Sequence, residues 1–231
     1  IHDLSPALTH YEADPSLRCA VIFAPGEHFT AGLDLVELQP KLTAGVFDFP
    51  ASQINPWGTS SRPRTKPVVV AVQGFCFTAG IELMLNADVV IADANTQFAQ
   101  MEVQRGILPF GGATVRFVQA AGWNKAMRYL LTGDSFNAQV ALDLNLITEV
   151  VETSTQNAAL ERALALAESI AQAAPLAVQA TLASAQQAVQ LGADYAFAHL
   201  QEHLSPLLKT QDAQEGVMAM LQRRPAQFKG Q

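Results

Sequence analysis

Cysteine is nearly missing from this chain, which has two in 231 residues, Cys19 and Cys76. Two cysteines without a Cys-x-x-Cys or Cys/His spacing exclude a disulfide framework and indicate no structural metal site. We expect both to be small buried residues in a reducing compartment. No apolar run approaches the roughly 20 residues of a membrane span, and the first residues lack the regions of a signal peptide. These absences predict a soluble, cytoplasmic protein with no membrane partner.

Basic charge is also scarce. The chain has 14 Lys and Arg against 21 Asp and Glu, a formal net charge of −7. Because binding to a phosphate backbone needs a basic face, this charge argues against nucleic acid as a partner. Hydrophobic residues make up 49% and charged residues 15% of the sequence. That composition excludes a disordered chain and predicts a sizeable core.

Several motifs of catalysis and ligand binding are absent as well. The chain has no Gly-x-Ser-x-Gly, no Gly-x-Gly-x-x-Gly and no phosphate-loop lysine. His199 and His203 have i, i+4 spacing, but no Glu-x-x-His pattern accompanies them, and such a pair is typical of a helix surface. We therefore expect neither a nucleophilic enzyme nor a metal site.

What the chain does contain is a series of short β-branched runs bounded by Pro, Gly, Asp or Asn. They predict buried strands at 18–23, 67–72, 88–92 and 146–151. Helix-like segments lie between them, at 33–42, 82–87, 112–121, 124–131 and 138–142. Strands separated by helices predict an α/β fold with a mostly parallel sheet.

The composition changes to Ala, Leu and Gln from Thr155 onward, and no further strand is predicted. Signals for helix starts and stops divide this part into four helices: Pro175 starts the second, Gly192 ends it, Asp194 caps the third, and Asp212 with Glu215 starts the fourth. The sequence thus predicts an α/β core over 1–153 and a helical region over 154–231. Helices that extend past a finished core need a surface to pack on, so we expect subunits to associate there.

Two turns of small residues each follow a predicted strand and precede a predicted helix, at 29–35 (Phe-Thr-Ala-Gly-Leu-Asp-Leu) and 74–83 (Gly-Phe-Cys-Phe-Thr-Ala-Gly-Ile-Glu-Leu). Amides at a helix start are unpaired and carry the positive end of the dipole. Two such turns can direct two N–H groups at one oxygen, as a reaction that develops an oxyanion requires. A tight strand-to-helix connection explains the small residues equally well.

Two carboxylates stand out because their neighbours are apolar. Glu82 lies in Gly-Ile-Glu-Leu-Met and Glu102 in Phe-Ala-Gln-Met-Glu-Val. Carboxylates that share a pocket push their pKa values apart, which allows one to act as acid and the other as base. Each is also explained as a solvated surface residue. The irregular stretch 45–64, with Phe47, Phe49 and Trp57, is long enough to cover a pocket.

With the turns and both carboxylates in view, the chain resembles the crotonase superfamily, specifically the enoyl-CoA hydratase/isomerase group. The resemblance runs from about Leu8 to the C-terminus. It is strongest from Lys-Pro-Val-Val-Val-Ala-Val-Gln-Gly at 66–74 through Phe-Ala-Gln-Met-Glu at 98–102 to Gly-Ile-Leu-Pro-Phe-Gly-Gly-Ala-Thr-Val-Arg at 106–116. The fold that this implies is a spiral of β-β-α turns, followed by C-terminal helices that build trimers, often paired as hexamers.

The same resemblance implies roles for individual residues. The oxyanion-hole amides of the family fall on Leu33 and Ala79, and its two catalytic carboxylates fall on Glu82 and Glu102. Both carboxylates would hold one water, which adds to a 2-enoyl-CoA thioester while the hole stabilises the enolate. Coenzyme A is then part of the substrate, and no other cofactor is expected. The remaining substrate-binding positions that the resemblance implies are Ala31, Gly32, Phe110, Met220 and Arg223, of which Met220 and Arg223 would reach a neighbouring subunit's ligand.

The chain departs from the family's pattern in places. The family's first strands and its Arg/Lys-Asn-Ala segment, which contacts coenzyme A, would precede Ile1. Val36 stands where many members have Lys, and Phe110 stands in the acyl pocket where Pro-Gly-x-Gly-Gly is usual. Hydration of an enoyl-CoA is the leading expectation. The alternatives are isomerisation of the double bond, for which one carboxylate usually suffices, and a non-catalytic acyl-CoA-binding protein.

Overall fold

A four-stranded parallel sheet forms the centre of the protein. The computed structural model describes residues 1–231 apart from residues 2, 45–48, 61, 154 and 156. The strand order is β1-β2-β4-β7, with bounds Ala20–Ile22, Val68–Val72, Val89–Asp93 and Glu149–Val151. All four predicted strands and the parallel sheet are confirmed. The last one starts three residues later than predicted, because pairing with β4 begins only at Glu149, although Leu146 and Ile147 before it are also buried and apolar.

Both faces of this sheet are buried, which explains why its strands are continuous apolar runs. Val68, Val70 and Val72 of β2 face the main core, where they meet buried helical residues such as Ile81 and Phe117. Val69 and Ala71 face the other side and pack on the first C-terminal helix, α7 (Ala158–Gln172). Successive side chains on a strand point to opposite faces, so one strand supplies two cores.

A second sheet, which the sequence analysis did not predict, has the order β3-β5-β6. Its strands are Phe75–Phe77, Gln97–Ala99 and Phe136–Asn137. β3 and β5 are parallel, whereas β5 and β6 are antiparallel. Strands of two or three residues are too short to show a periodic pattern, so their presence is decided by pairing.

Four helices of the core follow the predicted segments closely, whereas α3 (Ala79–Met84) begins and ends three residues before the predicted 82–87. The four are α2 (Leu35–Thr43), α4 (Ala113–Ala121), α5 (Trp123–Leu130) and α6 (Ala138–Asp143). Two helical segments were not predicted, namely α1 (Leu4–Ala13) and the short 3₁₀ helix η1 (Glu102–Arg105). η1 carries one of the two carboxylates singled out above.

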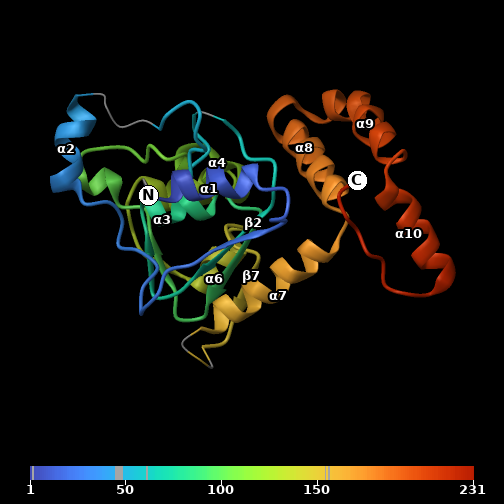
Figure 1. Cartoon of the computed structure of the whole chain (residues 1–231). Helices are drawn as coiled ribbons and strands as arrows, with labels where there is room; N and C mark the ends of the chain where they lie inside the picture. The colour runs from blue at the N-terminus through green and yellow to red at the C-terminus, as the bar shows by residue number, and fades with distance from the viewer. Residues whose placement is uncertain (2, 45–48, 61, 154, 156) are drawn as a thin grey trace.

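The predicted C-terminal helices are also present, and they divide into two groups. α7 packs against β1, β2, β4 and β7 of the sheet. The other three, α8 (Pro175–Leu191), α9 (Ala193–Leu207) and α10 (Gln211–Gln222), stand together beside the core (Figure 1). No single helix in the described ranges is long and apolar enough to cross a membrane, and α7 with α8 reaches that length and composition only as a pair bent by 107°.

Two predicted helix caps are wrong, while two predicted boundaries are confirmed. Pro175 is the first residue of α8 and Gly192 ends it. The N-cap of α9 is Gly192 rather than Asp194, and the N-cap of α10 is Thr210, whose hydroxyl accepts a hydrogen bond from the Ala213 amide. The Asp212 carboxylate instead accepts hydrogen bonds from the amides of residues 229 and 230 in the C-terminal segment.

Helix α1 is held in place by side chains from the segment that precedes β2. The Lys66 ammonium is buried and donates to the carbonyls of Tyr11 (3.0 Å) and Asp14 (2.6 Å), at the end of α1. The Tyr11 hydroxyl donates to the carbonyl of Pro67 (2.7 Å), and the ammonium lies 5.3 Å from the Tyr11 ring. A cation at a helix C-terminus also interacts favourably with the dipole. Tertiary contacts of this kind explain a helix that its own sequence pattern did not reveal.

We predict that Lys66→Met lowers the free energy of unfolding by about 1 to 3 kcal/mol, because two buried carbonyls lose their donor. Urea unfolding at one protein concentration measures the effect. Lys41→Met is the matched control, since Lys41 forms an exposed pair with Glu37 and such pairs contribute less than about 1 kcal/mol. Equal losses in the two variants would show that the buried ammonium has no special role.

Candidate functional site

A cavity of about 140 Å³ at the junction of the two predicted turns collects most of the predicted site residues. From that prediction it includes Ala31, Leu33, Ala79, Glu82, Glu102 and Phe110. The other lining residues are Leu35, Thr78, Met101, Arg105 and Ile107. The cavity therefore combines two carboxylates, two turn backbones and an apolar wall.

Strand β3 joins the first turn to the second. Thr30 forms a parallel bridge with Cys76, the Thr30 amide donates to the Phe75 carbonyl (2.8 Å), and the Phe77 amide donates to the Thr30 carbonyl (3.0 Å). Gly32 has φ +107°, and a Cβ atom there would lie 2.1 Å from the Thr78 hydroxyl oxygen. The turns can touch because this position has no side chain.

The same strand also explains why the two carboxylates meet. β3 pairs in parallel with β5, with Phe77 opposite Ala99, and the Thr78 amide donates to the Ala99 carbonyl (2.9 Å). Carboxyl ends of parallel strands lie at one edge of a sheet. The chain after β3 therefore runs beside the chain after β5, which brings Glu82 and Glu102 to one cavity although 20 residues separate them.

Helix α3 begins at Ala79, so this residue supplies one of the unpaired amides of a helix start. Glu82 is three residues later and lies on the same face of the helix. Within the described residues, neither the Ala79 nor the Leu33 amide donates a hydrogen bond. Leu33, Ala79 and Gly32 also line an adjoining cavity of about 210 Å³, so both amides lie where two hollows meet.

Glu82 is 1% exposed, and one of its carboxylate oxygens accepts hydrogen bonds from two amides, Gly111 (2.7 Å) and Ala113 (3.1 Å). Burial, with a smaller contribution from the charge of Glu102, raises the pKa of Glu82 to about 7, although the two amides and Arg116 act in the opposite direction. A carboxyl with such a pKa is present in both protonation states near neutral pH. It can therefore accept or donate a proton there.

Glu102 opens η1 and is also buried. Its Oε1 accepts a hydrogen bond from the side-chain amide of Gln100 (2.8 Å). Among the described residues, its Oε2 has no hydrogen-bond partner, and neither has the amide oxygen of Gln100. Burial raises the pKa of Glu102, and the Gln100 hydrogen bond partly offsets this. The sequence analysis did not single out Gln100, although its place two residues before Glu102 was a signal.

An aromatic wall of Phe49, Trp57 and Phe110 packs beside the site, and Phe110 is the member that lines the cavity. The Trp57 ring makes edge-on contacts with Phe110 (centroids 5.6 Å apart) and Phe49 (6.2 Å), and its indole N–H donates to the Ala79 carbonyl (3.2 Å). The irregular stretch thus supplies Phe49 and Trp57, neither of which is among the residues that line the cavity, so its role as a cover stays a prediction. Phe47 lies outside the described residues. The Trp57 ring thus contacts both Phe110, which lines the cavity, and the turn that holds Ala79.

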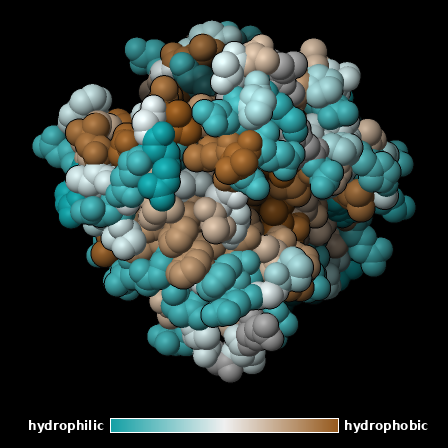
Figure 2. Space-filling model, turned by 90° about the vertical axis from the view of Figure 1, so that its left-hand side faces the viewer, coloured by the Kyte–Doolittle hydropathy of each residue, from teal (hydrophilic) through white to brown (hydrophobic). Residues whose placement is uncertain are grey.

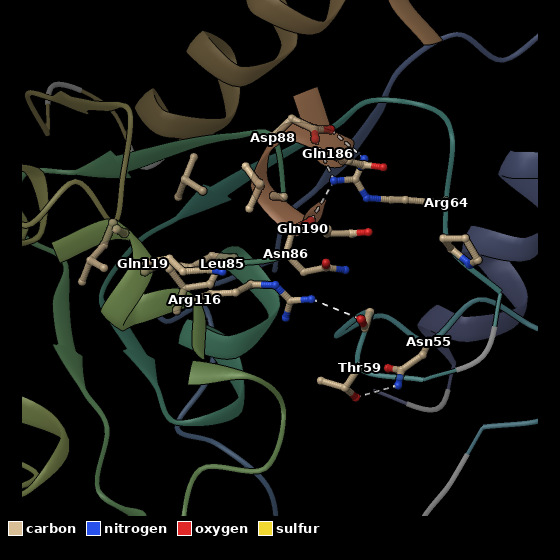
Figure 3. Close-up of a pocket in the computed structure, with 18 of the residues that line it drawn as sticks. Asn55, Thr59, Arg64, Leu85, Asn86, Asp88, Arg116, Gln119, Gln186 and Gln190 are labelled. Atoms are coloured by element: carbon tan, nitrogen blue, oxygen red, sulfur yellow. Dashed lines mark hydrogen bonds and ion pairs between the residues drawn. The ribbon is translucent and has the colours of Figure 1, made fainter. Parts of the chain in front are cut away.

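A larger cavity of about 740 Å³ lies between the core and α8. It is lined by polar side chains that include Arg64, Asp88, Asn86, Gln186 and Gln190, and it contains neither Glu82 nor Glu102 (Figure 3). Arg64 and Asp88 form a salt bridge there (2.7 Å). A candidate site chosen by cavity volume alone would therefore be one that lacks Glu82 and Glu102.

Arg116 connects this larger cavity to the wall. Its guanidinium donates to the carbonyls of Trp57 (2.7 Å) and Gly58 (3.2 Å). These hydrogen bonds fix the backbone that carries the Trp57 ring. The sequence analysis did not assign a role to Arg116, because nothing in the sequence shows that its partners are backbone atoms 58 or 59 residues away.

The surface on the α2 side of the molecule is hollowed. Hydrophobic side chains gather in and around the hollow, and hydrophilic side chains surround them (Figure 2).

No group of three or more His, Cys, Asp or Glu side chains in the described part of the chain could hold a metal ion. His199 and His203 lie on α9, where they contact the Tyr195 carbonyl and the Gln187 side chain.

Comparison with known proteins gives the family. The family model described as enoyl-CoA hydratase/isomerase matches residues 1–231. The chain belongs to this family. The 2,3-dehydroadipyl-CoA hydratase of Escherichia coli K12 is 33% identical over 230 residues, which cover 100% of this chain and 86% of that protein.

Solved structures agree with this membership. The crystal structure of a probable enoyl-CoA hydratase/isomerase from Mycobacterium abscessus has a TM-score of 0.95 at 45% identity, covering 100% of this chain and 88% of that one. An enoyl-CoA hydratase from Mycobacterium tuberculosis H37Rv has a TM-score of 0.86 at 31% identity, with the same coverage. The crotonase-like fold inferred from the resemblance is confirmed.

Two of the residues assigned through the family resemblance lie away from the cavity within one chain. Met220 lies on α10 and is 70% exposed, and Arg223 is the residue that ends this helix, with φ +53°. Neither is among the residues that line the cavity of the paired acids. Any contact of these two with a substrate of this family member would have to come from a second subunit.

We predict that the raised pKa of Glu82 makes the stability of this family member fall as the pH rises from 4.5 to about 7. In that range the folded protein holds a proton that the unfolded chain releases. Glu82→Gln cannot titrate, so its stability relative to the wild type should increase by up to about 3 kcal/mol across this range.

Urea unfolding at pH 4 and pH 8 tests this prediction. The exposed Glu152→Gln is the control variant. If the difference between the wild type and Glu82→Gln were the same at both pH values, the Glu82 carboxyl would have an ordinary pKa in the folded protein.

Proposed function

We propose that this protein is a hydro-lyase that adds water across the double bond of a 2-enoyl-CoA thioester. The observation that carries the proposal is the convergence of Glu82 and Glu102 with the Leu33 and Ala79 turns on one cavity. The relatives named as CoA hydratases support it. Coenzyme A serves as part of the substrate, and the proposed reaction uses no other cofactor.

The proposed mechanism gives each group one task. The thioester oxygen accepts hydrogen bonds from the Leu33 and Ala79 amides, which stabilise negative charge as the enolate forms. A water between the carboxylates bonds through its oxygen to C3 and gives one proton to an ionised carboxylate. A protonated carboxyl delivers a proton to C2, so that H and OH are added in balance.

The buried setting supports these proton transfers. One Glu82 oxygen is engaged by two amides, while Oε2 of Glu102 is buried and has no partner among the described residues. Such an oxygen can hold a water without first losing another hydrogen bond. Isomerisation of the double bond, which usually needs one carboxylate, does not explain why two carboxylates with raised pKa values share the cavity.

We predict that Glu82→Gln and Glu102→Gln each lower hydration by about 10²- to 10⁴-fold, because a proton donor or acceptor is lost while the shape is kept. The decrease of crotonyl-CoA absorbance measures turnover, and circular dichroism checks the fold. Glu152→Gln is the matched control. Near wild-type turnover in either site variant would contradict the two-carboxylate mechanism, and no turnover by the wild type across a panel of 2-enoyl-CoA thioesters would contradict the function.

We further propose that the protein assembles through its C-terminal helices as a trimer or a pair of trimers, acts in the cytoplasm, and divides into a core at 1–153 and an oligomerisation region at 154–231. The exposed apolar side chains of α8, α9 and α10 support the assembly. Those that are 65% exposed or more are Val189, Phe197, Met220 and Leu221, together with Leu208, the residue that follows α9.

In such an assembly Arg223 reaches the coenzyme A that is bound by a neighbouring subunit. We predict that Arg223→Ala raises KM for acyl-CoA by about tenfold with a smaller change in kcat. The anionic coenzyme A moiety, which is remote from the reacting atoms, would lose its guanidinium partner. Light scattering gives the mass and steady-state kinetics give KM. Arg128→Ala, which breaks an exposed pair with Asp134, is the control. A fully active monomer, or an unchanged KM in a trimer, would refute the proposal.

A further inference from the structure

The cavity of the paired acids contains a cation that the proposed reaction does not use. Arg105 lines this cavity together with Glu82 and Glu102. It is the last residue of η1, and Glu102 is the first. A 3₁₀ helix has three residues per turn, so side chains at i and i+3 lie one above the other. The fold of η1 therefore directs Arg105 to the same side as the carboxylate of Glu102.

The Arg105 guanidinium is not neutralised by the chain. Within the described residues it forms no salt bridge, and its hydrogen bond is a 3.4 Å contact with the carbonyl of the adjacent Gln104. Glu102 does not pair with it, since Oε1 of Glu102 accepts from Gln100 and Oε2 has no partner. A guanidinium has five N–H donors, and most of those of Arg105 remain available.

Its surroundings favour an acidic ligand over a neutral one. Arg105 is exposed, which places it at the rim, whereas the carboxylates of Glu82 and Glu102 are buried. The other side chains near it, including Leu33, Met101 and Ile107, are apolar and cannot pair with a charge. An acyl group with a carboxylate would be repelled by the two acids unless a cation met it. Among the described residues that line this cavity, Arg105 is the one positively charged side chain.

The size of the cavity indicates which part of the substrate would reach Arg105. About 140 Å³ is small for a ligand pocket, since typical pockets measure roughly 300 to 1,000 Å³. A short acyl chain with its double bond at the carboxylates would therefore end near the rim. Coenzyme A phosphates could also pair with a guanidinium, but the acyl group, not the nucleotide, must lie beside Glu102 for the reaction.

We propose that Arg105 determines substrate specificity by binding a carboxylate at the far end of a short acyl group. The preferred substrates are then enoyl-CoA thioesters with an acidic acyl chain. This inference rests on the proposed function for its reaction, although not for the binding itself. A bidentate pair between guanidinium and carboxylate gives both strength and orientation.

Two substrates that differ at one end of the acyl chain test the proposal. Hex-2-enedioyl-CoA, with one thioester and one free carboxylate, is compared with hex-2-enoyl-CoA, in which a methyl group replaces the carboxylate. The wild type should have the higher kcat/KM for the acidic substrate. Arg105→Met should lower the acidic-to-neutral ratio by about tenfold, and Arg105→Lys should lie between them, because it keeps the charge but loses the planar fork.

The control variant is Arg128→Met, which removes a paired arginine from the surface of the core and should keep the wild-type ratio. Equal losses on both substrates in Arg105→Met would overturn the proposal and assign Arg105 to the coenzyme A phosphates. A wild type without preference for the acidic chain would overturn it as well, as would an unchanged ratio in the variant.

Binding measurements separate this inference from the proposed function. Adipoyl-CoA and hexanoyl-CoA are saturated and need no turnover, so calorimetry gives their Kd values for the wild type and for Arg105→Met. If the wild type hydrates neither enoyl-CoA, the proposed function fails, and the Kd ratio alone decides the role of Arg105. The proposal holds if only adipoyl-CoA binding weakens, by about tenfold, and fails if both Kd values change equally or neither changes.

Discussion

The three-residue strand β3 is the constraint on which the site depends. On one side it bridges to Thr30 through Cys76, and on the other it pairs with β5. The bridge to Thr30 places Gly32 directly against Thr78 and so brings the Leu33 turn to the Ala79 turn. The pairing with β5 brings Glu102 beside Glu82. Every polar group of the proposed reaction is therefore placed by hydrogen bonds of one short strand, whose own side chain Cys76 is fully buried.

Burying two carboxylates is unfavourable, and the structure offsets this cost chiefly by backbone and amide donors, with the charge of Arg116 as a smaller contribution at Glu82. Glu82 accepts from the Gly111 and Ala113 amides, and Glu102 accepts from Gln100. These donors favour the charged forms without removing the raised pKa that burial produces. An ion pair with Arg105 would have lowered the pKa values and occupied both partners. Keeping the acids and the arginine apart leaves the acids for proton transfer and the cation for a ligand.

The aromatic wall links the site to the rest of the core. Arg116 holds the Trp57 carbonyl, the Trp57 indole holds the Ala79 carbonyl, and Phe110 packs on the Trp57 ring. A Cβ atom on Gly111 would lie 2.8 Å from the Trp57 ring and 2.6 Å from the Glu82 carboxylate. The Trp57 ring, the Glu82 carboxylate and the turn at Ala79 are thus closely packed. A change in any one of them is expected to displace the others.

The sequence alone determined the α/β class, the four strands of the main sheet, both turns and the residue types of the site, because these depend on local patterns and on motif order. The second sheet, α1 and the placement of Gln100, Trp57 and Arg105 were decided by tertiary structure, since strands of two or three residues and contacts between distant segments leave no periodic signal. The family resemblance identified Glu82 and Glu102 before any geometry was known, while only the pairing of β3 with β5 explains how they meet. In the same way, the sequence could show that Arg105 is charged, but its position in the cavity follows from the turn of η1.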